Sequence, residues 1–330
     1  MLDPYIQRTL IQTSLIVIMS IGFTWTYMVE KFPNFAQTAF ATLGTLLTYH
    51  LAFFYGLTPY ESLPVSMISC GLLGALIYML VVRPIKRYGS REITLTFAFF
   101  SFALMLSSIT NIYSYWLTFT VGPVNGFMLG RMDFNVGGIP GVVYAAPAMA
   151  STLILLLFLF LRYVKLGIAI RAVAEDEELS GTFGVDTLRV HIASWFMTGA
   201  LAGLAGGILP LFRSTVLGAN DDFLVTVMAG SVIGGLNSIF GAMLGGALVS
   251  ISKDMINSLL ITLWGIRMEG FVTLIPIIFI FVILMLQPNG VVAWATGPHN
   301  PRETLRNTII IARAIFTDIH ESLKRLRRTV

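Results

Sequence analysis

Four histidines are the side chains best suited to metal binding or acid–base chemistry in this sequence, and they are scattered along it. His50, His191, His299 and His320 each lack a second histidine or a carboxylate at the spacing that metal sites use. We therefore interpret them as structural residues. The sequence also has no G-x-x-x-x-G-K-[ST] motif, the loop that cradles nucleotide phosphates. These observations predict a chain that is not an enzyme, has no catalytic residue and binds no metal or cofactor of its own.

Two breaks that carry amide side chains interrupt apolar segments. The first reads NFAQT at 34–38 and follows a proline, and the second reads GGLNS at 234–238. Irregular backbone within a membrane is tolerated where protein or a water-filled cavity supplies hydrogen-bond partners, so such breaks mark transport pathways. One break in each half also indicates an internal repeat. The residues predicted to line a substrate pathway are Asn34, Phe35, Gln37, Gly234, Gly235 and Asn237.

Glycine-rich breaks have a simpler explanation, which is close packing between helices. For Gly241-x-x-x-Gly245 we favour this explanation. The charged pair Lys253 and Asp254 follows the same apolar stretch, and on a helix the two side chains would point about 100° apart. We interpret this pair as anchors at a helix end.

The composition sets the class of protein. Of 330 residues, 56% are hydrophobic and 12% are charged, and the mean hydropathy is +0.81. Soluble domains carry about 25% charged residues, so most of this chain does not face water. Cys70 is the only cysteine, which excludes an intrachain disulfide. The sequence therefore predicts an all-α, polytopic transmembrane helix bundle.

Apolar runs of about 20 residues, the length that crosses a bilayer as a helix, give about eight or nine spans with discontinuous helices. One further stretch, 223–251, is too long for one span and contains six glycines, so we expect a short segment followed by a second helix. The predicted runs are 10–29, 34–55, 63–82, 93–112, 142–161, 191–212 and 270–286.

The basic residues predict the orientation, because Lys and Arg are retained on the cytoplasmic side. Fifteen of the 21 lie in three segments, which follow the third span, follow the fifth span and form the tail. An alternating path puts all three on one face. We therefore expect a multi-pass protein of the plasma membrane with its N-terminus outside and its C-terminus in the cytoplasm. Charge that is confined to such short segments argues against nucleic-acid binding.

The segment between the fifth and sixth spans carries the most specific pattern. It reads KLGIAIRAVAEDEELSGTFGVD from Lys165, and its alanine-rich middle predicts a helix that stops near Gly184. This segment resembles the coupling loop of the permease subunits of branched-chain amino acid ABC importers, G-x-A-x-R-A-x-x-x-[DN]-x-x-x-A-x-x-x-G-[IV]. Similar matches occur at 78–87 (YMLVVRPIKR), 200–207 (ALAGLAGG), 233–246 (IGGLNSIFGAMLGG) and 287–290 (QPNG).

The resemblance covers the chain to Gly290 and implies its organisation and partners. It implies a permease domain at 1–290 with a cytoplasmic coupling loop at 165–190, in which Gly167, Arg171, Asp176 and Gly184 contact an ATPase. It further implies a second, related permease, two cytoplasmic ATPase subunits that use the ATP, and an external solute-binding protein. The solute implied is a branched-chain amino acid.

The sequence departs from the family pattern at positions that could touch the solute. Where the family commonly has N-F-A-H-G-E, Gln37 and Ala39 replace the histidine and the glutamate. Asn237 and Phe240 replace a glycine and a proline. Relatives handle urea or short amides, so these solutes remain open. The competing class is an ATP-independent channel or secondary carrier for urea or a similar small polar solute.

The tail at 291–330 lies beyond the resemblance. Its apolar residues repeat at alternating spacings of four and three and are flanked by cations. Such an amphipathic helix would lie on an anionic membrane surface or pair with another helix. We favour membrane lipid or the body of the complex as its partner. The stripe consists of Leu305, Ile309, Ala312, Phe316, Ile319, Leu323 and Leu326.

Overall fold

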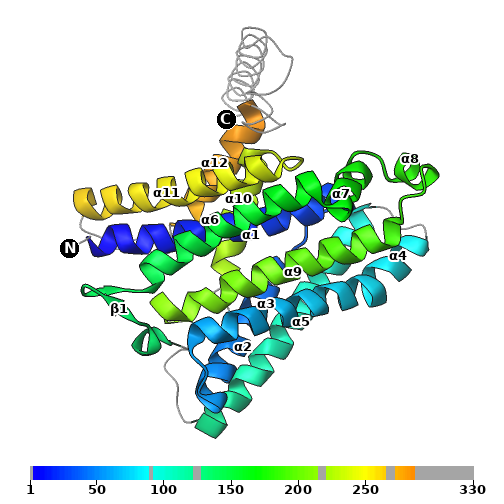
Figure 1. Ribbon diagram of the computed structural model, residues 1–330. Helices are drawn as coiled ribbons and strands as arrows, with labels where there is room; N and C mark the ends of the chain where they lie inside the picture. The colour runs from blue at the N-terminus through cyan, green and yellow to red at the C-terminus, as the bar shows by residue number, and fades with distance from the viewer. Residues whose placement is uncertain (1–2, 89–91, 122–127, 215–220, 265–271, 287–330) are drawn as a thin grey trace, which may run out of the picture.

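The computed structural model describes residues 3–88, 92–121, 128–214, 221–264 and 272–286, and these form a helical bundle (Figure 1). The predicted all-α class is confirmed. The helices are α1 (Pro4–Glu30), α2 (Gln37–Tyr55), α3 (Pro59–Ile77), α4 (Arg83–Arg87), α5 (Glu92–Val121), α6 (Val142–Tyr163), α7 (Lys165–Glu175), α8 (Glu177–Thr182), α9 (Thr187–Phe212), α10 (Asp221–Gly234), α11 (Ile239–Trp264) and α12 (Leu274–Leu286).

Local sequence signals start several of these helices. Asp3 caps α1 by accepting a hydrogen bond from the backbone N–H of Tyr5, and a proline occupies the first helical position. Thr58 and Glu61 form a capping box at the start of α3, each side chain accepting from the other's backbone N–H. A single π-helical turn, η1 (Tyr78–Val82), joins α3 to α4.

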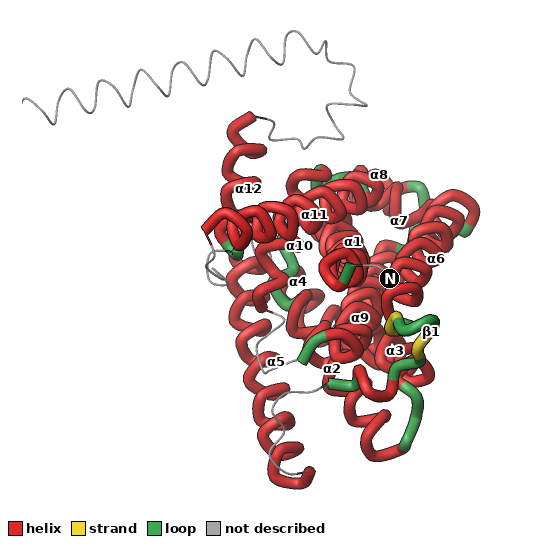
Figure 2. Tube along the Cα trace, turned by 90° about the vertical axis from the view of Figure 1, so that its left-hand side faces the viewer, coloured by secondary structure: helices red, strands yellow, loops and turns green. Residues whose placement is uncertain are grey.

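Helices α1 and α9 form the centre of the bundle. Their most apolar windows are 83% and 78% buried, whereas the other four helices long enough to span a membrane are 22–39% buried. Figure 2 shows α1 nearly end on, with α6, α9, α10 and α11 around it, and all four contact it. We call the end where α1 begins the Pro4 end and the opposite end the Glu30 end.

Glycines let the backbone of α9 approach its neighbours. A Cβ atom at Gly206 would lie 1.8 Å from the carbonyl oxygen of Ala41 in α2, and one at Gly199 would lie 2.3 Å from that of Cys70 in α3. Small residues at such crossings are typical of membrane helices, which gain stability from close packing rather than from burial away from water. This packing explains the ALAGLAGG stretch at 200–207.

The outer helices expose large apolar side chains, as expected where lipid replaces water. Leu72 of α3, Phe97 of α5 and Leu156 of α6 are all exposed. Six described helices are long and apolar enough to cross a membrane, and α10 and α12 are shorter apolar helices. The chain is thus a multi-pass membrane protein by its helices, while eight or nine spans stays a prediction.

Three expectations need correction. The apolar run predicted to end at residue 112 continues as α5 to Val121. The aromatic residues within 113–121 are therefore part of this helix. The expected pair of segments in 223–251 is confirmed as α10 and α11, but α11 extends to Trp264. Lys253 and Asp254 therefore lie within a helix and are not helix-end anchors. The predicted end of this helix was too early because the charged pair interrupts the apolar run.

A small hairpin lies at the Pro4 end. Strands β1 (Asn135–Val136) and β2 (Ile139–Pro140) pair antiparallel across two glycines with positive φ, and a 3-10 turn, η2 (Gly130–Met132), precedes them. Asp133 holds the hairpin in place by accepting hydrogen bonds from the Tyr60 hydroxyl, at 2.7 Å, and the Val142 N–H, at 3.0 Å. The tail at 291–330 lies outside the described residues.

Candidate functional site

Five side chains from four elements meet at the Glu30 end of the bundle. We call them the Glu30 cluster: Glu30 of α1, Lys86 of α4, Glu177 of α8, and His191 and Trp195 of α9. The members come from positions up to 165 residues apart in the chain. The cluster is the densest group of charged side chains that the described ranges contain in contact with one another, and it joins the loop at 165–190 to the two central helices.

The carboxylate of Glu30 is the centre of the cluster. Its Oε1 atom lies 2.7 Å from Nδ1 of His191 and accepts a hydrogen bond from the Trp195 indole N–H at 2.9 Å. Its other oxygen pairs with the Lys86 ammonium group. The Glu30 side chain is completely buried. An unpaired charge in an apolar interior costs roughly several kcal/mol, so a buried carboxylate needs partners such as these three.

His191 connects Glu30 to the loop. Its Nε2 atom lies 2.8 Å from the Glu177 carboxylate, while its ring stacks on Tyr78 with centroids 5.3 Å apart. The hydrogen bond with His191 lowers the pKa of Glu177, and the nearby Lys86 charge acts in the same direction, while partial burial and Glu30 oppose them. Glu177 therefore stays ionised, and its contribution to the contact is lost as the pH falls through this lowered pKa.

The loop at 165–190 contains α7 and α8, as the alanine-rich pattern predicts. Gly167 is buried, and a Cβ atom there would lie 2.3 Å from the Phe160 carbonyl oxygen, so α7 can fold back on α6. Asp176 caps α8 by accepting from the Leu179 N–H at 2.9 Å. Gly184 has a φ of 84° and closes α8 with a left-handed turn. Arg171 is exposed on α7.

A second contact fixes the loop to the bundle. The Lys31 ammonium group, just after α1, donates to the carbonyl oxygen of Ala174 near the end of α7, at 2.7 Å. Lys31 adopts a left-handed conformation with a φ of 61°, which ends α1. The first helix of the loop is therefore joined to the residue that follows α1, and the second is joined to His191 of α9.

The same loop exposes apolar side chains. Phe183 is 81% exposed at the end of α8, and Leu179 and Ile168 are also exposed. Arg171, Asp176 and Gly184 are also exposed, whereas Gly167 is buried. A cluster of exposed apolar residues outside the apolar spans is typical of a protein-binding surface. Phe183 was not among the predicted coupling residues, although an aromatic residue directly before a helix-ending glycine is a signal in the sequence.

Two of the three predicted pathway residues in the first break are buried, and Phe35 is half-buried. Asn34 and Gln37 are fully buried, and Phe35 packs edge-on against Phe100 with ring centroids 5.9 Å apart. Gln37 donates through Nε2 to the Met19 carbonyl oxygen at 3.5 Å. Asn34 accepts from the Ala36 N–H at 3.1 Å. Within the described part of the chain, Nδ2 of Asn34 and Oε1 of Gln37 have no hydrogen-bond partner.

The second break separates α10 from α11. Gly234 packs closely on Gly241: a Cβ atom at Gly234 would lie 1.9 Å from the Gly241 carbonyl oxygen. Gly235 has a φ of 98°. Asn237 is exposed. Gly245 packs on the backbone of Gly230. The close-packing explanation is therefore confirmed for the Gly241-x-x-x-Gly245 stretch.

Residues at or next to both breaks contact one section of α1. Gln37 contacts the Met19 carbonyl, and Ser231 of α10 donates to the next carbonyl, that of Ser20, at 3.1 Å. The exposed Asn237 is not part of this arrangement. A pocket lies elsewhere in the bundle, and its described lining includes none of the six predicted pathway residues.

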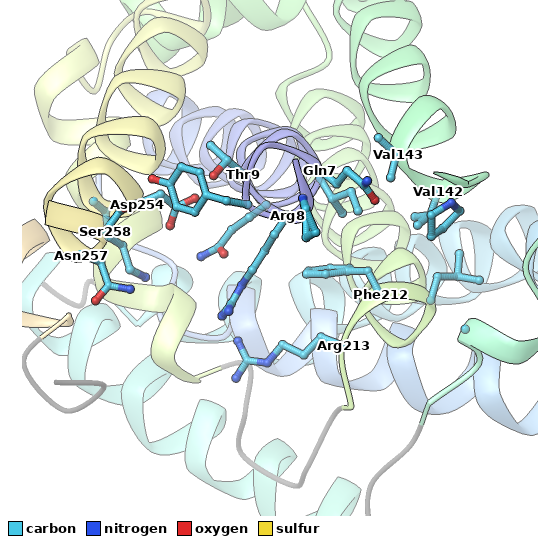
Figure 3. A pocket seen from close by; sticks show the side chains of 18 of the residues that line it. Gln7, Arg8, Thr9, Val142, Val143, Phe212, Arg213, Asp254, Asn257 and Ser258 are labelled. Atoms are coloured by element: carbon cyan, nitrogen blue, oxygen red, sulfur yellow. The ribbon is translucent and has the colours of Figure 1, made fainter. Parts of the chain in front are cut away.

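That pocket has a volume of about 1160 Å³ and opens at the Pro4 end (Figure 3). Its wall comes from the first turns of α1, η2, the starts of α6 and α10, the end of α9 and the second half of α11. Arg8 and Arg213 extend into the same space in Figure 3. The Arg213 guanidinium also lies over the Phe223 ring, 5.7 Å from its centroid.

Neither the Glu30 cluster nor this pocket could be predicted from the sequence. Both depend on residues that are far apart in the chain, and no spacing rule joins Glu30 to His191. A usable signal was nevertheless present. Arg8 and Arg213 lie outside the three basic segments, and a charged residue at such a position needs an explanation.

Comparison with known proteins gives a consistent result. Residues 5–282 match the family model described as branched-chain amino acid transport system, permease component. A probable branched-chain amino acid transport permease protein LivH of Methanocaldococcus jannaschii is 32% identical over 287 residues, which cover 87% of this chain and 91% of that protein. The high-affinity branched-chain amino acid transport system permease protein BraD of Pseudomonas aeruginosa is 26% identical over 257 residues, covering 72% and 80%.

Two further comparisons are weaker, one in coverage and the other in structural similarity. The high-affinity permease protein LivH of Escherichia coli is 30% identical over 139 residues, 42% of each chain. Among solved structures, PsaBC from Streptococcus pneumoniae in complex with Fab covers 86% of this chain and 92% of its own, with a TM-score of 0.46 and 13% identity.

The Glu30 cluster predicts unequal costs for removing its two carboxylates. Glu30→Gln keeps the shape but leaves His191 and Lys86 without their shared partner, so the free energy of unfolding should fall by about 3 kcal/mol or more. Glu177→Gln should cost about 1 kcal/mol or less, because Glu177 is half exposed. Denaturant titration of the full chain in detergent, followed by circular dichroism, measures both. Equal small losses would show that the cluster does not hold the helices together.

Proposed function

We propose, from the premise that this chain belongs to the family of branched-chain amino acid transport permease components, that it is the membrane-spanning subunit of an ABC-type importer for branched-chain amino acids. The family membership rests on a match over residues 5–282 and on 32% identity across 91% of a relative. The observation that carries the importer proposal is the loop at 165–190, which combines an exposed apolar surface with contacts to the central helices.

The proposed orientation puts the Glu30 end in the cytoplasm of the cell and the Pro4 end outside the plasma membrane. Two of the three basic segments support this assignment, because α4 and the α6–α9 connection both lie at the Glu30 end. Lys and Arg are retained on the cytoplasmic side of membranes. The C-terminal tail would then be cytoplasmic, where its cations could lie near anionic headgroups of membrane lipid.

The proposed partners follow from this arrangement. The loop docks on one of two cytoplasmic ATPase subunits, with Phe183, Leu179 and Arg171 on the contact surface. A second, related permease completes the pathway, and an external solute-binding protein delivers the solute at the Pro4 end. ATP is bound and hydrolysed by the ATPase subunits and not by this chain.

The Glu30 cluster would carry movement of the loop into the membrane. Glu177 lies in the loop, and its hydrogen bond to His191 reaches α9 directly. From His191 the contact continues to Glu30 at the end of α1. Because α1 and α9 are the most buried of the six described helices long enough to span a membrane, a displacement of α8 would act on the centre of the bundle rather than on its lipid-facing edge.

The buried amides remain our candidates for the substrate pathway. Nδ2 of Asn34 and Oε1 of Gln37 are a donor and an acceptor without partners in the described residues, so they could replace water around a passing polar solute. Phe35, Gly234, Gly235 and Asn237 are proposed with them. The coupling residues are proposed as Gly167, Arg171, Asp176 and Gly184, of which the two glycines shape the loop and Arg171 contacts the ATPase.

The importer proposal predicts ATP-dependent uptake of leucine by the full complex in proteoliposomes loaded with ATP and supplied with the binding protein. Arg171→Glu reverses a charge on the docking surface, so it should abolish uptake and weaken ATPase association. Arg87→Glu is the matched control, since it makes the same change at an exposed residue of α4, at the same end but outside the loop at 165–190. Radiolabelled uptake and co-purification of the ATPase measure the two effects.

Two results would contradict this proposal. Full uptake by the Arg171→Glu variant would show that the loop does not dock as proposed. Urea flux through this chain without ATP or a binding protein, together with no leucine uptake, would instead favour the channel or secondary carrier. The replacement of the family's histidine by Gln37 makes this second outcome worth measuring.

The pathway proposal predicts that cysteines at positions 34 and 37 react with small water-soluble thiol reagents in at least one nucleotide state of the complex. The background is Cys70→Ser, which removes the native thiol. Asn237→Cys, at an exposed residue, should react in all states, and Ser194→Cys, at a fully buried residue, is the protected control. Mass spectrometry of the labelled chain measures reactivity. Protection of positions 34 and 37 in every state would assign the first break to helix packing.

A further inference from the structure

The pocket at the Pro4 end has an unusual concentration of positive charge for its location. Of the six basic residues outside the three basic segments, four line this pocket: Arg8, Arg131, Arg213 and Lys253. They come from α1, η2, the residue after α9, and α11. In the proposed orientation this end lies outside, where Lys and Arg are depleted. Four cations around one concave space, on the unfavourable side of the membrane, indicate a binding site for an anionic group.

Lys253 shows that the charge extends to the floor of the pocket. It is only 7% exposed, and its ammonium group donates to the Thr226 hydroxyl of α10 at 3.3 Å. An ionised group inside a membrane-spanning helix is costly, and such residues face an interior cavity or a functional pathway. The position of Lys253 in the middle of α11 is therefore explained by the pocket beside it.

The pocket also has an acidic and polar side. Asp254 of α11 accepts a hydrogen bond from Thr9 of α1, and its Oδ2 atom is buried without a partner among the described residues. Asn257 and Ser258, one turn further along α11, lie beside it in Figure 3. A carboxylate oxygen of this kind is suited to accept hydrogen bonds from an ammonium group.

The third side of the pocket is apolar. Val142 and Val143 at the start of α6, together with Leu211 and Phe212 at the end of α9, complete the lining. In Figure 3 the two valines lie on the opposite side of the pocket from Asp254, with Arg8 and Arg213 between them. The wall thus presents cations, a carboxylate and an apolar surface, and the charges of Arg8 and Lys253 lie close enough to act on Asp254.

We infer that this pocket binds a free, zwitterionic α-amino acid with an apolar side chain before it enters the membrane. The α-carboxylate lies toward Arg8 and Arg213, the α-ammonium group toward Asp254, and the side chain toward Val142 and Val143. The inference rests on the proposed function and assigns to it a recognition site on this chain.

Two other anionic partners fit the lining less well. A phosphate headgroup of a lipid would meet the Asp254 carboxylate, which repels it. An acidic surface of the external binding protein would contact exposed, protruding cations, whereas Lys253 lies on the pocket floor. The combination of opposite charges with an apolar wall is specific to a small molecule that carries all three features.

Ligands that lack one charge separate these possibilities. Binding of leucine, of 4-methylpentanoate, which has only the carboxylate, and of isopentylamine, which has only the ammonium group, is measured on the full complex in nanodiscs without the binding protein. Arg8→Gln and Arg213→Gln should each weaken leucine and 4-methylpentanoate binding about tenfold or more and leave isopentylamine binding unchanged. Asp254→Asn should weaken leucine and isopentylamine binding and spare 4-methylpentanoate.

The controls separate this inference from the proposed function. Arg162→Gln removes an exposed cation at the Glu30 end and should change none of the three affinities. Arg8→Lys keeps the charge and should retain most of the leucine binding. If any change at position 8 disrupted the fold, this variant would lose leucine binding as well. If the wild-type complex takes up leucine and every pocket variant binds leucine with unchanged affinity, the pocket assignment is overturned while the proposed function stands. Weakened association with the binding protein, with leucine affinity unchanged, would make the cations a docking surface and would also overturn it.

Discussion

The buried carboxylate of Glu30 is the constraint on which the arrangement of the bundle depends. A charge with no exposure to water must have partners, and this one has three, from α4 and from two successive turns of α9. Those partners can reach it only if α1 ends beside the start of α9 and if the chain after α3 turns back over it. The requirement that one carboxylate be paired thus fixes the relative position of the central helices at one end of the molecule.

The other end of the same two helices is organised around a cavity instead of an ion pair. Arg8 in α1 and Arg213 after α9 lie at the pocket, and about 33 Å separates Arg8 from Glu30 along α1 at the usual rise per residue. Glycines in α9 keep its backbone against α2 and α3 between these ends. Close packing makes α9 a rigid connection, so a movement at His191 and a ligand at the pocket would act on the same elements.

Much of the fold could be predicted from the sequence, because a membrane helix needs a long apolar run and irregular backbone needs a partner. The short α10 before α11 and the left-handed turn at Gly184 both followed from glycine positions. The limit of α11 did not, because the polar Lys253 and Asp254 face a pocket that only the tertiary fold creates. The Glu30 cluster could not be predicted for a similar reason. His191 has no partner nearby in the sequence, and only the tertiary fold places residues 30 and 177 in contact with it.

The hydrogen bond between Glu177 and His191 connects the loop to the central helices, and its role is tested most directly by the uptake obtained per ATP hydrolysed. Glu177→Gln and the matched control Glu178→Gln, an exposed neighbour in the same turn, are compared in proteoliposomes for leucine uptake and phosphate release. We expect Glu177→Gln to lower the ratio about fivefold or more while hydrolysis and ATPase association persist, and Glu178→Gln to leave the ratio unchanged. An unchanged ratio in Glu177→Gln would contradict transmission through the Glu30 cluster.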